Sequence, residues 1–76
     1  MGTWNYRVIE FQSPDGEAFR SIHEVFYIDE LPVSYAKDAA SVFWLKDEGI
    51  AVAERILKRM EAALKLPILF ASQFKT

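Results

Sequence analysis

The first third of the chain carries apolar and polar residues in the pattern of two β-strands. The first predicted strand runs from Trp4 to Phe11 and the second from Ala18 to Ile28. Both are rich in β-branched and aromatic residues, which favour strands. Neither strand has a purely polar face, so both faces of the resulting sheet should be at least partly covered. Ser13-Pro14-Asp15-Gly16 lies between them and has the residues of a tight turn, so we expect a hairpin.

The middle of the chain gives a weaker pattern. Asp29-Glu30-Leu31-Pro32 predicts a second turn, and Val33 to Ala36 predicts a short third strand at an edge of the sheet. The apolar run Val42-Phe43-Trp44-Leu45 is compatible with a strand or with an apolar loop. The pattern does not decide between the two.

A helix is the clearest element of the second half. Its apolar residues follow helical spacing, at Ile50, Ala53, Ile56, Leu57, Met60, Ala63 and Leu64. We expect Asp47 to cap this helix, Glu48 to lie in its first turn, and Pro67 to end it near Lys65. Beyond it, residues 68–70 should pack on the core or add a brief strand, and residues 72–76 should fray.

The order of these elements is β-β-β-α. It predicts a single α+β domain over residues 1–76, with a small antiparallel three-stranded sheet packed on one C-terminal helix in two layers. One helix covers only one face of such a sheet. The second face should therefore meet residues 42–45, residues 68–70 or another chain, and a homodimer through the sheet or its edge is one hypothesis.

Composition narrows the possible functions. The 76 residues include 11 acidic and 9 basic side chains, a net charge of −2, so no basic field is present to hold a nucleic-acid backbone. Cysteine is absent, which excludes disulfides and thiolate metal sites. We find no apolar signal core and no segment of the ~20 apolar residues that span a bilayer, so we expect a cytoplasmic protein that does not enter a membrane.

Four short motifs are distributed over most of the chain: WNYRVI at residues 4–9, IHEVFY at 22–27, PVSY at 32–35 and LKLPIL at 64–69. With these motifs the chain resembles a group of short bacterial and phage-associated hypothetical proteins. Those proteins open with WNYRVI, continue with IHEVYY and end in a helix closing with KPVL. The chain departs from that pattern at residues 28–31, where the group has a Gly-rich turn, and at residues 41–45, where it has a Pro-containing loop. The resemblance implies a fold and supplies no chemistry.

His23 is the only histidine and the main candidate for catalysis. Its neighbour Glu24 cannot join it at one substrate, because adjacent residues of a strand point to opposite faces. A carboxylate across the sheet, such as Glu10, could still meet it. We expect a structural or surface histidine, no catalytic residue, no metal site and no cofactor.

The candidate partner-binding residues are Phe43, Trp44, Tyr35, Trp4, Arg55 and Arg59. Phe43 and Trp44 could instead cover the uncovered face of the sheet and be buried there. If they are exposed, they would be aromatic anchors for a protein partner. Tyr35 and Trp4 could belong to the same surface. The basic side of the helix, with Lys58, could meet an acidic partner or phosphates, or could simply be solvated.

Three functions remain as hypotheses. The first is a small non-enzymatic protein-interaction module of unknown target, such as a phage-type inhibitor of a host defence complex of the anti-CRISPR kind, by analogy of size and composition. The alternative is a nucleic-acid-binding accessory protein that uses sheet aromatics with Arg7, Arg20 and the helix cations. An enzyme built on His23 and two carboxylates is the third and least favoured hypothesis.

Overall fold

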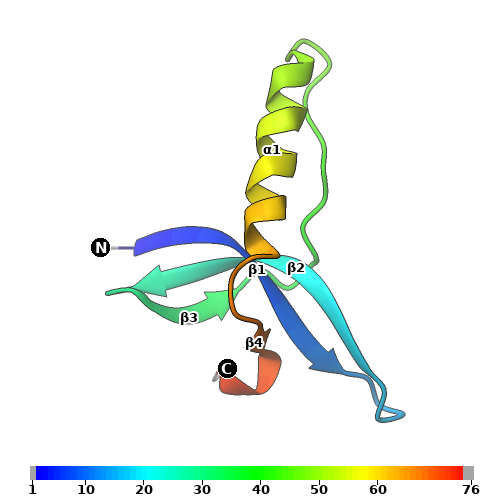
Figure 1. Cartoon of the computed structure of the whole chain (residues 1–76), viewed down its shortest axis with the longest axis vertical. Helices are drawn as coiled ribbons and strands as arrows, with labels where there is room; N and C mark the ends of the chain where they lie inside the picture. Colours follow the sequence, from blue (N-terminus) through cyan, green and yellow to red (C-terminus); the bar gives the residue numbers. More distant parts are fainter. Residues whose placement is uncertain (1, 75–76) are drawn as a thin grey trace.

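A computed structural model describes residues 2–74 (Figure 1). Its elements, in chain order, are β1 (Gly2–Gln12), β2 (Ala18–Ile28), β3 (Leu31–Tyr35), α1 (Ile50–Ala63), β4 (Leu69–Phe70) and the short 3₁₀-helix η1 (Ala71–Gln73). The sheet has the strand order β3-β2-β1-β4. The α+β class expected from the sequence is therefore confirmed.

The predicted hairpin of β1 and β2 is confirmed over its full length. The strands are antiparallel from the pair Gly2 and Ile28 to the pair Gln12 and Ala18. The turn has Gly16 at φ 90°, a conformation that favours glycine, and the Gly16 N–H donates to the Ser13 carbonyl oxygen at 2.9 Å. Asp15 accepts hydrogen bonds from the Ser13 hydroxyl and the Glu17 N–H, which lower the pKa of its carboxyl.

The turn between β2 and β3 is tighter than expected. Asp29 and Glu30 have φ of 50° and 66°, and Ile28 pairs directly with Leu31. Two central residues with positive φ are typical of the type I′ hairpin turn, whose twist suits antiparallel strands. Pro32 therefore lies inside β3, which is acceptable because β3 is an edge strand.

The expected three-stranded antiparallel sheet is incomplete, because β4 adds a fourth strand. Ile9 and Glu10 of β1 pair with Leu69 and Phe70 in parallel orientation, so the sheet is mixed. The brief strand considered for residues 68–70 thus exists. A parallel neighbour of β1 requires a long crossover connection, and residues 13–68 supply it.

The main core cluster lies on one face of the sheet, the face of Ile9 and Val25, which are fully buried, while Val8 is buried on the opposite face. Leu69 and Phe74 cover the face of Ile9 and Val25 from the C-terminal segment. Phe74 is only 8% exposed, so the prediction that residues 72–76 fray is wrong for the described residues 72–74, while residues 75–76 lie outside the described part. Burial of one aromatic ring fixes this end of the chain.

The helix begins later and is less covered than the sequence predicts. Its N-cap is Gly49, without a side-chain hydrogen bond, and its first turn holds no acidic residue, so the assignment of the cap to Asp47 and of Glu48 to the first turn is wrong. Glu48 instead accepts a hydrogen bond from the Leu45 N–H at 2.7 Å, which places it in a turn ahead of the helix. Only Ala53 and Ala63 of α1 are buried. The helix therefore forms only part of the expected second layer.

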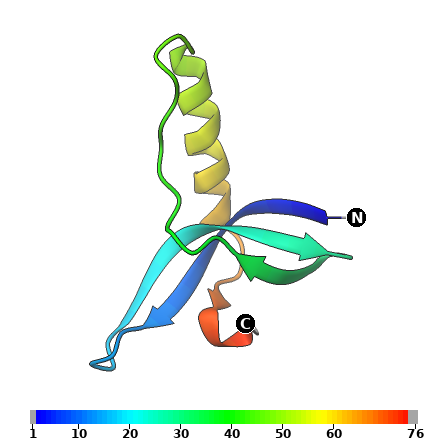
Figure 2. The same ribbon diagram turned by 180° about the vertical axis from the view of Figure 1, so that it is seen from behind.

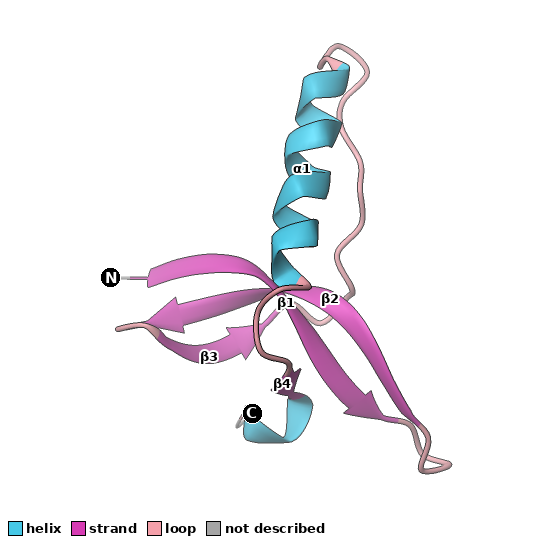
Figure 3. Ribbon diagram, in the orientation of Figure 1, coloured by secondary structure: helices cyan, strands magenta, loops and turns pink. Residues whose placement is uncertain are grey.

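Three parts of the molecule project in different directions, as Figures 1 and 2 show from opposite sides. One is the turn end of the β1–β2 hairpin, and the second is the opposite end of the sheet, with the start of β1 and the β2–β3 turn. The third, which we call the arm, consists of α1 and the loop of residues 36–49, which runs alongside the helix (Figure 3). The helix points away from the sheet, with its C-terminal end nearest to β1.

Candidate interaction surface

Hydrogen bonds join the loop of the arm to the sheet at its base and close a turn at its tip. At the base, the Ala36 N–H donates to the Glu24 carbonyl oxygen and the Ala40 N–H donates to the Ile22 carbonyl oxygen, both on β2. At the tip, the Glu48 N–H donates to the Leu45 carbonyl oxygen at 2.9 Å, and the Leu45 N–H donates to the Glu48 carboxylate at 2.7 Å. The apolar segment therefore lies between a base that is bonded to β2 and a local turn.

That apolar segment, Val42–Leu45, is exposed. Phe43 is 72% exposed and Leu45 is 64% exposed, while Val42 and Trp44 are just above one third. The alternative that Phe43 and Trp44 plug the second face of the sheet is wrong, because the C-terminal segment occupies that face.

Tyr35 and Trp4 do not share a surface. Tyr35 pairs with Val25 and faces the core, where its ring meets Phe74 at a centroid distance of 4.9 Å and an interplanar angle of 74°. Trp4 pairs with Phe26, and adjacent residues of β2 face opposite ways. Tyr35 is therefore a core residue, and Trp4 belongs to the face on which the helix lies.

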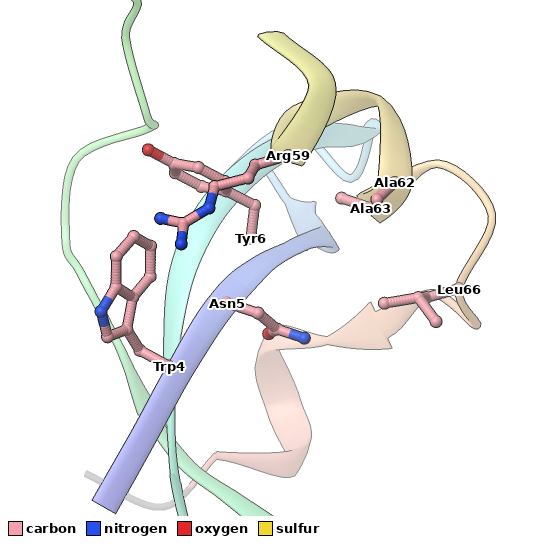
Figure 4. Close-up of a pocket in the computed structure, with 7 residues that line it drawn as sticks. All are labelled: Trp4, Asn5, Tyr6, Arg59, Ala62, Ala63 and Leu66. Carbon is pink, nitrogen blue, oxygen red and sulfur yellow. The ribbon is translucent and has the colours of Figure 1, made fainter. Parts of the chain in front are cut away.

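Trp4 and Arg59 meet at the base of the arm (Figure 4). The guanidinium carbon of Arg59 lies 5.4 Å from the centroid of the Trp4 ring, a cation–π contact, and the Tyr6 ring meets Trp4 edge-on. Together with Asn5 and Leu66 these residues line a depression of about 230 Å³. Ligand pockets usually enclose ~300–1,000 Å³, so this site is small for a metabolite.

Arg55 lies one turn closer than Arg59 to the N-terminal end of α1. With Val52, Ile56 and Arg59 it lines a second shallow depression, which extends the basic side of α1 away from the sheet. The two predicted arginines are therefore neighbours, and Trp4 is next to one of them. Phe43 and Trp44 are on the loop instead.

His23 is buried on the core face of the sheet. It is 3% exposed, and both ring nitrogens have partners: Nε2 lies 2.8 Å from the Ser21 hydroxyl and Nδ1 lies 2.8 Å from the Ala36 carbonyl oxygen. An Nδ1–H donating to the carbonyl and an Nε2 accepting from the hydroxyl satisfy the neutral ring. The ring joins the start of the arm loop to the sheet.

The arginines proposed for nucleic-acid binding are engaged within the chain. Arg7 donates to the Tyr27 hydroxyl at 2.7 Å and to the Pro67 carbonyl oxygen at 2.6 Å. Arg20 forms an ion pair with Glu10 at 3.0 Å. Within residues 2–74, no group of three or more His, Asp or Glu side chains is placed to hold a metal ion.

Sequence reasoning missed the exposure of one side of the helix. Ile50, Leu57 and Leu64 were assigned to the buried stripe, but their exposed fractions are 64%, 53% and 66%. Their spacing of seven residues is a visible signal, because it places them on one side of a helix. Periodicity identifies an apolar side without identifying what covers it.

Among the described residues, no helix has the length and apolar character needed to cross a membrane. Comparison of the chain with protein-family models, with curated proteins and with solved structures gives no match.

Proposed function

We propose that this protein is a non-enzymatic protein-interaction module that binds its target through the apolar segment of the arm. The observation that carries the proposal is the exposure of Phe43 and Leu45 on a loop that is hydrogen-bonded to β2 at its base and closed by a turn at its tip. Large apolar side chains exposed together mark contact surfaces. In its narrower form, the proposal is a phage-type inhibitor of a bacterial defence complex.

The surroundings of the segment support a protein partner. Trp44, with 39% of its surface exposed, lies next to Phe43 and can add aromatic contact area. Tryptophan and tyrosine dominate the residues on which protein–protein affinity depends. The engaged side chains of Arg7 and Arg20 do not favour nucleic acid as the partner.

A pull-down from bacterial lysate tests the proposal. Tagged wild-type protein is compared with Phe43→Ser and with the control Phe19→Ser. The control changes a 51%-exposed phenylalanine near the turn end of the β1–β2 hairpin. Circular dichroism first establishes that all three are folded. We expect one protein to be recovered by the wild type and by Phe19→Ser, with at least a tenfold smaller yield for Phe43→Ser.

Two results would contradict the proposal. Equal recovery by the wild type and Phe43→Ser would exclude the arm segment as the binding surface. Failure of the wild type to enrich any protein over an untagged control would remove the basis for a binding function in that lysate.

A further inference from the structure

The chain exposes more surface than a compact protein of its mass. Its accessible surface is 6070 Å² for a mass of 8.8 kDa. The scaling of area with mass predicts roughly 4,800 Å² for a compact monomer, an excess of roughly 1,300 Å². The radius of gyration is 13.8 Å, whereas about 11 Å is expected for this length. The arm and the hairpin end account for this shape.

Part of this excess accessible surface is an apolar area on one face of the sheet. Trp4 and Phe26 are opposite each other on β1 and β2, and Ile28 and Leu31 are opposite each other on β2 and β3. Because Phe26 and Ile28 are two residues apart, all four side chains are on the same face. Their exposed fractions are 45%, 37%, 54% and 67%, in the order Trp4, Phe26, Ile28 and Leu31. We call these four residues the sheet patch.

A second part of the excess surface is the exposed side of α1 and of its C-cap residue, formed by Ile50, Leu57 and Leu64, which we call the helix stripe. At 100° per residue, Leu57 lies about 120° around the helix from Ala63. Ala63 is only 1% exposed and is part of the end of the helix that packs on β1. Leu57 also lies about 40° from Ala53, which is 7% exposed, so the stripe is on the flank of the helix, beside the side that its own chain buries.

The two surfaces have the dimensions of partners in a helix-on-sheet layer. The axes of the outer two of three strands are about 10 Å apart, close to the ~10–12 Å diameter of a helix. Helix-on-sheet packing is also the arrangement that the β-β-β-α order favours, and in a single chain the C-terminal end of α1 is the part that lies at the sheet (Figure 1).

We propose that two copies of the chain associate about a two-fold axis, with the helix stripe of each copy packed on the sheet patch of the other. This arrangement uses the two exposed apolar surfaces of each chain, with Arg59 of the same chain against Trp4 at the edge of the sheet patch. It closes the assembly, as isologous dimers do. A standard interface buries about 800 Å² per partner, which the excess of roughly 1,300 Å² can supply. Residues 42–45 take no part in it, so the dimer and the proposed target binding are independent.

Analytical ultracentrifugation tests the association. We expect the wild type to sediment with twice the 8.8 kDa mass of the chain. Leu57→Glu places a charge in the helix stripe and should halve this mass. The control Leu45→Glu makes the same change at a leucine of similar exposure outside both surfaces and should leave the mass unchanged.

Cross-linking tests the arrangement even if Leu57→Glu fails to fold. The chain has no cysteine, so Leu57→Cys and Phe26→Cys each carry a single thiol. With a short bis-maleimide linker, a mixture of the two variants should give a covalent dimer in at least tenfold higher yield than either variant alone.

Three outcomes would overturn the proposal. The first is a wild-type chain that remains at 8.8 kDa at high concentration, which would leave these surfaces to a different protein. The second is efficient cross-linking of Leu57→Cys with itself, which indicates helix-on-helix packing. The third is efficient cross-linking of Phe26→Cys with itself, which indicates sheet-on-sheet packing.

Discussion

Truncation of Phe74 to alanine should remove much of the stability of the domain. The side chain is 8% exposed and packs with Ile9, Val25 and Leu69, and its ring meets Tyr35 edge-on. Loss of a buried phenylalanine side chain costs about 3–5 kcal/mol, from lost transfer free energy and the cavity that remains. At roughly 0.05–0.15 kcal/mol per residue, a 76-residue domain has about 4–11 kcal/mol of unfolding free energy. The variant should therefore be marginally folded.

Urea denaturation followed by circular dichroism measures this loss, with all variants at one protein concentration. With a slope of about 1 kcal/mol per molar urea, the midpoint should fall by roughly 3–5 M. Phe74→Leu retains most of the volume and should lose about 0.5–1.5 kcal/mol, the value of the aromatic contact. Phe43→Ala is the matched control. Its ring is 72% exposed, so its loss should stay below about 1 kcal/mol. Equal, small losses for Phe74→Ala and Phe43→Ala would refute the assignment of Phe74 to the core.

Two further predictions concern the ends of secondary-structure elements. Gly49 is an extended N-cap residue with no atom within 4 Å of an added Cβ, so Gly49→Asp should stabilise the helix start by about 0.5–1 kcal/mol, and an unchanged melting temperature would contradict this. In the turn between β1 and β2, hydrogen bonds from the Ser13 hydroxyl and the Glu17 N–H lower the pKa of the Asp15 carboxyl below its ordinary value of 3.8. The stabilisation of the folded state by the Asp15 carboxylate is therefore fully present above that pH, and it is lost as the pH falls through the pKa of Asp15 in the folded state. Thermal melts should show Asp15→Asn less stable than the wild type near neutral pH and the difference vanishing in acid; a difference that grows in acid would be inconsistent with this sign.

Local patterns of the sequence were sufficient for the hairpin and for the existence of the helix. Alternating strand residues flank a turn whose proline and glycine have clear conformational roles, and the register from Gly2 to Gln12 follows. The helical spacing after Gly49 was equally clear. These features depend on neighbours in sequence, so the sequence is enough to predict them.

The candidate surface was only partly predictable. The apolar run at residues 42–45 and the basic side of the helix were visible in the sequence, and Phe43 proved exposed. Which aromatic residues belong to the core was not visible, because Tyr35 and Trp4 have similar local contexts. The pairing of each with β2 decided their faces.

Tertiary contacts decided the remaining features. The parallel strand β4 and the burial of Phe74 depend on contacts between the C-terminal segment and β1, about 60 residues earlier in the chain. The exposure of Ile50 and Leu57 depends on how the helix packs on its own chain, where Ala53 and Ala63 are buried and these two residues are not. An apolar period shows that a helix has a side to bury; the fold alone decides whether its own chain covers that side.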